Sequence, residues 1–175
     1  MMIRKALAAD FAAACELYKV VCDDMQARGI DQWRWGEYPN EDFLQKSLDA
    51  GTLYVAHEGD KLLCAVTIDT NFDPEYADVN WLFGVKPGSF HRLGIQPAAQ
   101  GKGLGKAILA DVEEILLAKG CDCLRIDTYS LNQNAQKLYA RYGMRRVGEV
   151  KFFHRELPFI CYEKPITDAC PLLPL

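Results

Sequence analysis

The sequence predicts an α/β fold, a single domain in which flanking helices pack on a mixed central sheet. Predicted strands and amphipathic helices alternate along the 175-residue chain, and no internal repeat or linker divides it. Half of the residues are hydrophobic and a quarter are charged, as in ordinary globular domains. We expect the domain to cover residues 1–166 and an irregular tail to follow over residues 167–175.

The first predicted elements are a strand over residues 3–7 and a long helix. Asp10 stands where an N-cap residue is expected, and Gly29 stands where the helix would end. The hydrophobic residues of this helix recur at helical spacing and are Phe11, Ala14, Tyr18, Cys22 and Met25. After an aromatic-rich connection, we expect Asn40 to cap a short second helix that ends at Gly51.

The middle of the chain begins with a β-hairpin, predicted over residues 52–70 around the turn EGD. Residues 71–88 show no clean period and contain Pro, Gly and Asn. We predict a long loop there with a fragment of strand, and loops of this length are often functional. A strand over residues 89–97 follows and stops at Pro97.

The second half of the chain is predicted to begin with a helix that follows a glycine-rich turn. One face of this helix carries Leu104, Ile108, Val112 and Ile115. A strand follows over residues 123–129, and Asn132 is placed to cap a helix over residues 133–142. The last two predicted strands are residues 145–153 and 158–166.

Composition and charge exclude several classes of protein. The formal net charge is −4 and no run of Lys and Arg occurs, so we expect no nucleic-acid partner. No apolar stretch approaches the roughly 20 residues that span a membrane. The seven cysteines are odd in number and no secretory signal precedes them, which predicts reduced thiols in a cytoplasmic protein. Cys121 and Cys123 lack zinc-ligand spacing, so we assign them to the core and expect no metal site.

The stretch QGKGLGK, residues 100–106, is the strongest candidate for a binding site. A P-loop would need glycine in place of Gln100 and Ser or Thr in place of Ala107. The dinucleotide fingerprint G-x-G-x-x-G begins at Gly101 but meets Lys106 at its last position. A third interpretation is a strand–turn–helix whose backbone N–H groups face a diphosphate. A simple connection between strand and helix is the alternative.

Two motifs resemble those of the GNAT family of N-acetyltransferases. The turn resembles the acyl-coenzyme A motif [QR]-x-x-G-x-[GA], with Gln100, Gly103 and Gly105 in place. A later stretch resembles the family's N-x-x-A-x-x-L-Y-x-x-x-G-[FM] helix, and its matching residues are Asn132, Ala135, Leu138, Tyr139, Gly143 and Met144. The resemblance is sharpest over residues 91–144, and the order of elements extends it to about residues 1–164.

The resemblance implies an acyl-CoA N-acyltransferase fold, with a mostly antiparallel sheet and one splayed strand pair. It also implies that acetyl-CoA (coenzyme A) binds as the acetyl donor. The residues it assigns to the coenzyme are Leu93, Gly94, Ile95, Gln100, Gly101, Lys102, Gly103, Leu104, Gly105, Lys106, Asn132, Ala135 and Tyr139. Gly94 would ease the splay, or it marks a simple bulge. Asn132 would cap its helix and also contact the coenzyme's arm.

Acetyl transfer to an amine needs a base for the amine proton and an acid for the leaving thiolate. The resemblance assigns the acid to Tyr139, and the alternative is a core residue on an apolar helix stripe. Two residues compete as the base. His91 lies on the strand before the turn, and histidine titrates near neutral pH. Asp127 lies in the later strand and would need burial or an ordered water.

The amine acceptor is expected to bind among the early helices and the loop over residues 71–88. The aromatic residues that would line this site are Trp33, Trp35, Tyr38, Trp81 and Phe83. Aromatic walls with nearby acids suit a cationic amine with an apolar body. The alternative is that these rings cap the sheet edges.

These observations predict direct transfer of an acetyl group from acetyl-CoA to a primary amine of a small molecule or peptide. The family resemblance implies direct attack in a ternary complex, and it also allows a homodimer. A non-catalytic acyl-CoA sensor is the main alternative, because a sensor needs the turn but not the acid. An acyltransferase for longer acyl groups is a second alternative.

Overall fold

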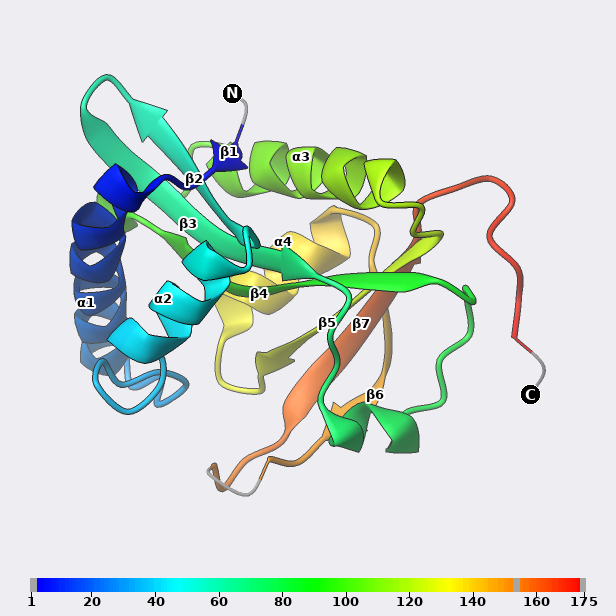
Figure 1. Ribbon diagram of the computed structural model, residues 1–175. Coiled ribbons are helices and arrows are strands. Elements are labelled where there is room, and N and C mark those ends of the chain that lie inside the picture. The colour runs from blue at the N-terminus through cyan, green and yellow to red at the C-terminus, as the bar shows by residue number, and fades with distance from the viewer. Residues whose placement is uncertain (1–2, 153–154, 174–175) are drawn as a thin grey trace. The chain divides into compact units, whose positions relative to one another are not determined.

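The computed structural model describes residues 3–152 and 155–173. Its sheet has seven strands in the order β1-β2-β3-β4-β5-β7-β6 (Figure 1). The strands are β1 (Arg4–Lys5), β2 (Leu53–Glu58), β3 (Lys61–Asp69), β4 (Pro87–Ile95), β5 (Cys123–Tyr129), β6 (Arg145–Val150) and β7 (Phe159–Pro165). The helices are α1 (Phe11–Ala27), α2 (Glu41–Asp49), α3 (Leu104–Ala118) and α4 (Gln133–Arg141), and the 3₁₀ helices are η1 (Ala8–Asp10), η2 (Pro74–Asp78) and η3 (Pro97–Ala99).

The strand pairings confirm the predicted α/β class with a mixed, mostly antiparallel sheet. β1 with β2, β2 with β3, β5 with β7 and β6 with β7 pair antiparallel. β4 and β5 pair in parallel, through Pro87 with Cys123 and Gly88 with Leu124. This parallel pair therefore joins the first residues of the two strands.

The chain divides into two compact units. Unit 1 comprises Met1–Ile68 and Phe90–Asp111. Unit 2 comprises Asp69–Ser89 and Val112–Leu175. β4 and α3 each contribute residues to both units, because the unit boundaries fall within them.

The core of unit 1 forms between α1 and the β2–β3 hairpin, as the hydrophobic spacing predicts. Of the five residues expected on the buried face of α1, only Phe11 remains half-buried. Residues 62–68 of β3 are buried without a break, which is typical of a strand covered on both faces. Each large side chain buried in this way contributes roughly 1.5–3 kcal/mol to folding. Asn40 caps α2 as predicted, by accepting a hydrogen bond from the Phe43 N–H.

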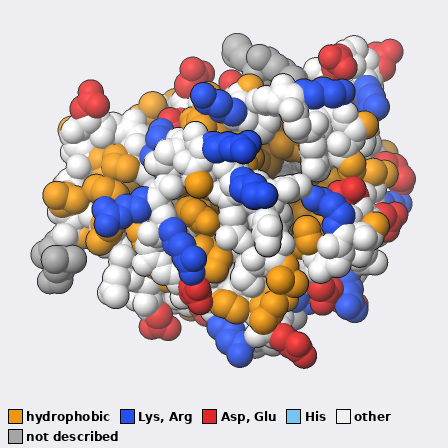
Figure 2. All heavy atoms as spheres, turned by 180° about the vertical axis from the view of Figure 1, so that it is seen from behind, with side chains coloured by type: hydrophobic (Ala, Val, Ile, Leu, Met, Phe, Trp, Pro, Cys, Tyr) orange, Lys and Arg blue, Asp and Glu red, His pale blue; other side chains and the backbone are white. Residues whose placement is uncertain are grey.

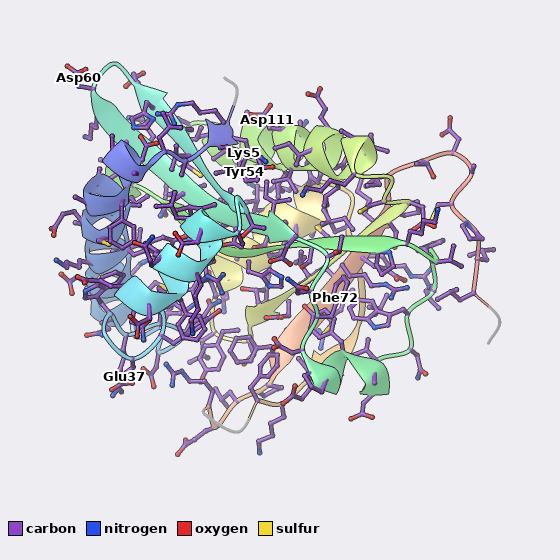
Figure 3. The ribbon with its side chains drawn as sticks, in the orientation of Figure 1. Lys5, Glu37, Tyr54, Asp60, Phe72 and Asp111 are labelled. Atoms are coloured by element: carbon purple, nitrogen blue, oxygen red, sulfur yellow. The ribbon has the colours of Figure 1, made fainter. Side chains whose placement is uncertain are left out.

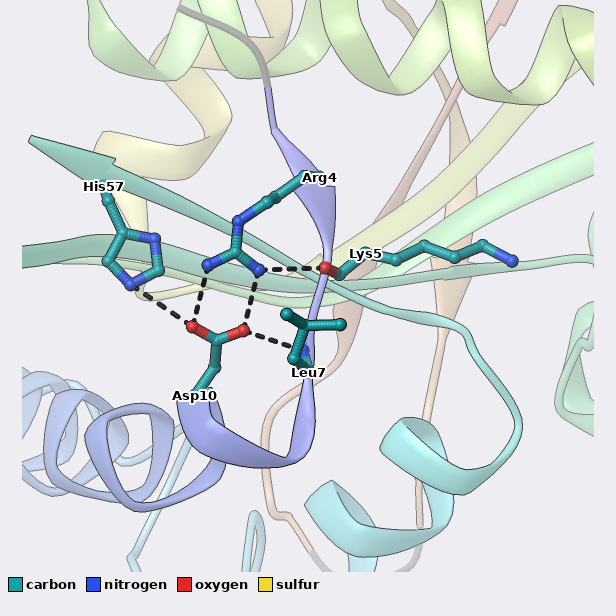
Figure 4. Close-up of polar contacts among 5 residues, drawn as sticks. All are labelled: Arg4, Lys5, Leu7, Asp10 and His57. Carbon is teal, nitrogen blue, oxygen red and sulfur yellow. Dashed lines mark hydrogen bonds and ion pairs between the residues drawn. The ribbon is translucent and has the colours of Figure 1, made fainter.

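Asp10 does not cap α1 as predicted, because η1 runs directly into α1 and leaves Asp10 in a helical conformation. Its carboxylate accepts two hydrogen bonds from the Arg4 guanidinium, at 2.7 and 2.9 Å, and one from the Leu7 N–H at 2.7 Å. His57 Nε2 lies 3.4 Å from Asp10 Oδ1 (Figure 4). The Asp10 side chain therefore ties β1 and β2 to the start of α1.

The N-terminal strand of unit 1 is held at two more points. Lys5 pairs with Tyr54 across the β1–β2 ladder. Asp111 of α3 accepts a hydrogen bond from the Ile3 N–H at 2.9 Å (Figure 3). Short as it is, β1 is therefore anchored by both backbone pairing and side-chain contacts.

Unit 2 is built on β7, which lies between β5 and β6. All seven residues of β5 pair with β7 in register, from Cys123 with Pro165 to Tyr129 with Phe159. The α4 side chain Tyr139 packs edge-on against Tyr162 of β7, with ring centroids 5.7 Å apart. Phe153, the last residue of the predicted strand 145–153, lies outside the described residues, and β6 ends at Val150.

The segment predicted as a loop over residues 71–88 contains η2 and is fixed to the sheet of unit 2 by charged side chains. Glu163, which is fully buried, accepts hydrogen bonds from the N–H groups of Leu82 at 2.8 Å and Phe83 at 3.4 Å. Arg125 donates to the carbonyls of Phe83 and Gly84, at 2.6 and 3.2 Å. The segment therefore has a defined path despite its lack of a sequence period.

Burial raises the pKa of Glu163, although the two backbone hydrogen bonds and Arg125 oppose that rise.

Beyond Gly84, Asp122 accepts hydrogen bonds from the Val85 and Lys86 N–H groups. Close packing requires glycine at position 84, where a Cβ would lie 2.2 Å from Cys123 Sγ. The C-terminal tail also takes part, since Leu172 forms a β-bridge with Phe83.

Within the described residues, no helix is long and apolar enough to cross a membrane, and no His, Cys, Asp and Glu residues cluster as a metal site. All seven cysteines are free thiols, and Cys121 and Cys123 are buried in the core as predicted. On the face shown in Figure 2, basic, acidic and hydrophobic side chains are interspersed.

Candidate functional site

The glycine-rich turn of unit 1 lies between η3 and the start of α3. Gly101 and Gly103 have φ values of +78° and +83°, a left-handed conformation that side chains rarely adopt. A Cβ at either position would have no heavy atom within 4 Å, so the space beside the backbone is open. The Gln100 side chain fixes the start of the turn by donating to the Ile95 carbonyl at 3.1 Å.

The turn offers the donors that a diphosphate requires. Ala107 makes the first backbone hydrogen bond of α3, to Gly103 at 3.2 Å, so the N–H groups before it precede the helical ladder. Lys102 and Lys106 are exposed, and the helix N-terminus adds partial positive charge. Leu104 is buried and anchors the first turn of the helix. Open space, backbone donors and two cations together fit a phosphate group.

The strand before this turn contains a distortion that the sequence does not predict. Arg92 has a φ of +54°, and it is the only described residue other than glycine with a positive φ. The hydroxyl of buried Tyr18 donates to the Arg92 carbonyl at 2.5 Å and lies 3.3 Å from the Ala65 carbonyl. The left-handed residue of this strand is therefore Arg92 and not Gly94. Gly94 packs closely on Tyr18, since a Cβ there would lie 3.1 Å from the Tyr18 ring.

The Arg92 side chain gathers polar groups from three elements of unit 1. Its guanidinium donates to the Tyr38 hydroxyl at 3.1 Å, to Thr67 Oγ1 at 3.0 Å and to Ser47 Oγ at 3.3 Å. It also lies 5.8 Å from the ring centroids of Tyr38 and Phe43. Tyr38, predicted to line the acceptor site, is thus next to the distorted residue of β4.

The other predicted residues of unit 1 have different surroundings. Trp33 is buried and packs edge-on against Tyr18 at 6.0 Å, so its place is that of a core residue. Trp35 is half-buried, with Lys19 Nζ 5.8 Å from its ring centroid. His91 is half-buried on β4, next to Arg92.

In unit 2, Asp127 of β5 accepts a hydrogen bond from a residue that sequence reasoning missed. The Tyr76 hydroxyl donates to Asp127 Oδ2 at 2.7 Å. Tyr76 belongs to η2, within the segment predicted as a loop, and is buried. Burial raises the pKa of Tyr76, and the negative charge of Asp127 raises it further.

Tyr139 of α4 is buried, and its pKa is raised first by burial and then by the negative charge of Asp127. The two side chains approach the β5–β7 pair from opposite faces. Asp127 is opposite Cys161 in the register, whereas Tyr139 packs on Tyr162, the next residue of β7. Because successive strand residues point to opposite faces, the predicted acid and base are on different sides of this pair.

Asn132 begins α4 as predicted. Its Oδ1 accepts a hydrogen bond from the Ala135 N–H at 3.2 Å, so its role as a helix cap is confirmed. Asn132 is buried and Ala135 is half-buried. Ser130, two residues earlier, has a buried hydroxyl with no hydrogen-bond partner among the described residues.

The two aromatic residues predicted in the loop are fixed within unit 2. The Trp81 indole N–H donates to the Tyr76 carbonyl at 2.9 Å, and the Arg125 guanidinium lies 4.9 Å from the Trp81 ring centroid. The Phe83 backbone is held by Glu163 and Arg125. Both side chains are half-buried, as a site wall or a cover of the sheet would be.

The fold places this chain with acetyltransferases of known structure. A GNAT-family acetyltransferase from Streptococcus agalactiae superposes with a TM-score of 0.80 and 21% identity, covering 94% of each chain. The protein yncA from Salmonella typhimurium, solved with its cofactor acetyl-CoA, superposes with a TM-score of 0.69 and 18% identity. That comparison covers 95% of this chain and 94% of yncA.

The sequence profile of the Acetyltransferase (GNAT) family matches residues 9–144, more than half of the chain, and the chain belongs to this family. Thialysine N-epsilon-acetyltransferase from Bos taurus is 33% identical over 60 residues. This aligned segment is 34% of the present chain and spans about a third of the relative's length, 35%.

Proposed function

We propose that this chain is an N-acetyltransferase that transfers the acetyl group of acetyl-CoA to a primary amine of a small molecule or peptide. The observation that carries the proposal is the open glycine turn at the start of α3, in a member of the GNAT family. The acetyl-CoA in the yncA structure supports the donor. The amine specificity in the name of the bovine relative supports the acceptor class.

When bound, acetyl-CoA supplies an activated acetyl thioester. The turn residues Gln100–Gly105 would hold its pyrophosphate through backbone N–H groups, with Lys102 and Lys106 adding countercharge. Backbone groups of Leu93–Ile95 would hold the coenzyme's arm and polarise the thioester carbonyl. Asn132 and Ala135 are proposed as further contacts to the arm.

Tyr139 is proposed as the acid that protonates the departing thiolate. Its raised pKa keeps the hydroxyl protonated at neutral pH, as a proton donor requires. The same rise makes the proton harder to give up, because acids work best when their pKa is near the working pH. Substitution of Tyr139 therefore decides whether this proton is used.

Asp127 and His91 are proposed as candidates for the base that deprotonates the amine. Asp127 has the stronger structural support, since the Tyr76 hydroxyl orients its carboxylate. Its position on the opposite face of the β5–β7 pair from Tyr139 also suits the reaction. An amine can then lose its proton on one side while the thiolate gains one on the other.

Trp33, Trp35, Tyr38, Trp81 and Phe83 are proposed as the aromatic residues of the acceptor site. Tyr38 and the Arg92 guanidinium would present both a ring face and hydrogen-bonding groups to the acceptor. Trp81 and Phe83 would contribute from the segment that Glu163 and Arg125 hold in place.

The test is acetyl-CoA turnover, measured by thiol release against a panel of small amines and N-terminal peptides, with calorimetric binding of acetyl-CoA alongside. We expect binding, and release with one class of acceptor. Tight binding without release from any amine would instead support an acyl-CoA sensor. Absence of binding would contradict the assignment of the glycine turn.

A further inference from the structure

We infer that Tyr76 is a positioning residue for acetyl transfer, whose hydroxyl holds the Asp127 carboxylate in place as the reaction's base. The inference deepens the proposed function and rests on it. It assigns a role to a segment, residues 71–88, in which sequence reasoning identified aromatic wall residues but no residue acting on the chemistry.

The geometry fixes the Tyr76 hydroxyl tightly. The Tyr76 ring contacts those of Phe72 and Trp81, with centroids 5.5 and 5.1 Å away. The Trp81 indole donates to the Tyr76 carbonyl at 2.9 Å, which holds the backbone of the same residue. With ring and backbone both held, the hydroxyl donates to Asp127 Oδ2 at 2.7 Å.

The residues that anchor this segment lie on one face of the β5–β7 pair. Arg125 and Asp127 alternate along β5 and therefore share a face, opposite Glu163 and Cys161 in the register. Arg125 and Glu163 hold the backbone at Leu82, Phe83 and Gly84. The segment that carries Tyr76 is thus held by two charged side chains, Arg125 and Glu163, on the same face of the β5–β7 pair as Asp127.

Three ionisable groups, each from a different element, feel the negative charge of the Asp127 carboxylate. Its negative charge raises the pKa of Tyr76 from η2, of Tyr139 from α4 and of Cys161 from β7. Burial is the largest cause at each of these three groups. The cation on the same face, Arg125, is directed to the Trp81 ring and to backbone carbonyls.

A neutral hydroxyl suits the positioning of a base. It fixes one carboxylate oxygen and favours the charged form without adding a positive charge that would suppress proton uptake further. Asp127 takes the proton that the amine loses as its nitrogen bonds to the acetyl carbon, and Tyr139 protonates the thiolate released when the C–S bond breaks.

The first experiment follows the titration of Asp127 by carbon NMR in protein labelled at the aspartate carboxyl carbons. The signal is assigned by its loss in Asp127→Asn. Tyr76→Phe removes only the hydroxyl, so we expect the pKa of Asp127 to rise by about one unit. Tyr54→Phe, which removes the hydroxyl of a buried tyrosine in unit 1, should leave this titration unchanged.

The second experiment measures the pH dependence of kcat/KM for the same variants. In Tyr76→Phe the acid limb of the profile should move to higher pH by the same amount as the NMR titration. The KM for acetyl-CoA should stay constant, because Tyr76 is not assigned to the coenzyme. In the Asp127→Asn background, adding Tyr76→Phe should cause no further change in the profile.

The outcomes separate the inference from the proposed function. An Asp127 titration that is identical in wild type and Tyr76→Phe overturns the positioning role. A shifted titration with an unmoved kcat/KM profile also overturns it, because Asp127 is then not the base. If the Asp127 titration shifts in Tyr76→Phe but the wild-type protein transfers no acetyl group, the proposed function is overturned. Any catalytic role for Tyr76 then falls with it, while the hydrogen bond to Asp127 stands.

Discussion

Gly103 and Gly120 stand near opposite ends of α3 and share a left-handed backbone, with φ values of +83° and +79°. At both positions an added Cβ would meet no heavy atom within 4 Å. Replacement of either glycine by alanine should therefore introduce a similar backbone strain, roughly 1–2 kcal/mol. Only Gly103→Ala places a methyl group and a strained backbone at the proposed pyrophosphate site.

We predict that Gly103→Ala raises the Kd for acetyl-CoA at least about tenfold, a loss of about 1.4 kcal/mol. Gly120→Ala should bind as wild type does. Calorimetry with the two matched variants makes the comparison, and urea unfolding checks that their stabilities agree. Equal Kd values for both would show that the turn only connects η3 to α3.

The hydroxyl oxygen of Tyr139 distinguishes two interpretations of this residue, a general acid and a core residue. Tyr139→Phe keeps the ring that packs on Tyr162 and removes the hydroxyl. If the hydroxyl donates its proton, kcat should fall by about 100-fold, the lower range for general acid catalysis, at unchanged Kd for acetyl-CoA. Single-turnover kinetics with the best acceptor measures the chemical step. A wild-type rate would show that Tyr139 is a core residue and not the acid.

At the scale of elements, the contact between α1 and β4 sets the backbone that precedes the turn. Tyr18 bonds the carbonyl of Arg92, whose left-handed conformation costs roughly 1–2 kcal/mol. We predict that Tyr18→Phe, which removes the hydroxyl bonded to the Arg92 and Ala65 carbonyls, lowers the free energy of unfolding by about 1–3 kcal/mol. Urea unfolding measures this loss, with Tyr54→Phe as the control for removing a buried tyrosine hydroxyl.

The same variant tests whether the left-handed backbone at Arg92 matters for activity. If β4 relaxes once the Tyr18 hydroxyl is gone, kcat/KM should fall while the Kd set by the glycine turn changes little. A stability loss with unaltered kcat/KM would mean that Tyr18 serves folding alone. The distortion of β4 would then have no part in placing Leu93–Ile95.

The elements that sequence reasoning placed well are those with local signals. Asn40 and Asn132 were expected to cap helices and do so, because an N-cap bond spans only three residues. The contacts that shape the site are not local. Tyr76 and Asp127 are 51 residues apart, Tyr18 and Arg92 are 74 apart, and Glu163 and Leu82 are 81 apart.

No periodicity or cap motif reports such pairs, which is why residues 71–88 were expected to be a loop. The one hint was compositional, because a segment expected to be a loop contains several aromatic residues, among them Phe72, Tyr76 and Trp81. Asp10 was expected to cap α1 and does not. Its residue type fits a helix cap, but the preceding 3₁₀ turn directs the carboxylate to Arg4 instead.

At the scale of the whole molecule, acid stability depends on carboxylates whose pKa values differ between the folded and unfolded states. Burial raises the pKa of Asp122, but backbone hydrogen bonds from Val85 and Lys86 lower it more. The Arg4 hydrogen bonds lower the pKa of Asp10 against the effect of its burial. Glu163 has a raised pKa and acts in the opposite sense, becoming less unfavourable as the pH falls.

Asp10 allows the clearest test, because its carboxylate contacts both β1 and β2. Its folded-state pKa lies below its unfolded value, so the unfolded chain binds more protons in acid. The stability that Asp10 contributes is therefore complete above about pH 3.9 and is lost as the pH falls through the folded value. At neutral pH, we predict that Asp10→Asn lowers the free energy of unfolding by about 1.5–3 kcal/mol.

This difference from wild type should shrink as the pH drops below about 3.9, because the wild-type carboxyl then becomes neutral as well. Urea unfolding of both proteins across this range measures it. Glu16→Gln, which breaks the exposed ion pair with Lys19, should leave stability almost unchanged at any pH, because solvent screens this pair. A loss in Asp10→Asn that stays constant with pH would show that the shape of this side chain, and not its charge, joins β1 and β2 to α1.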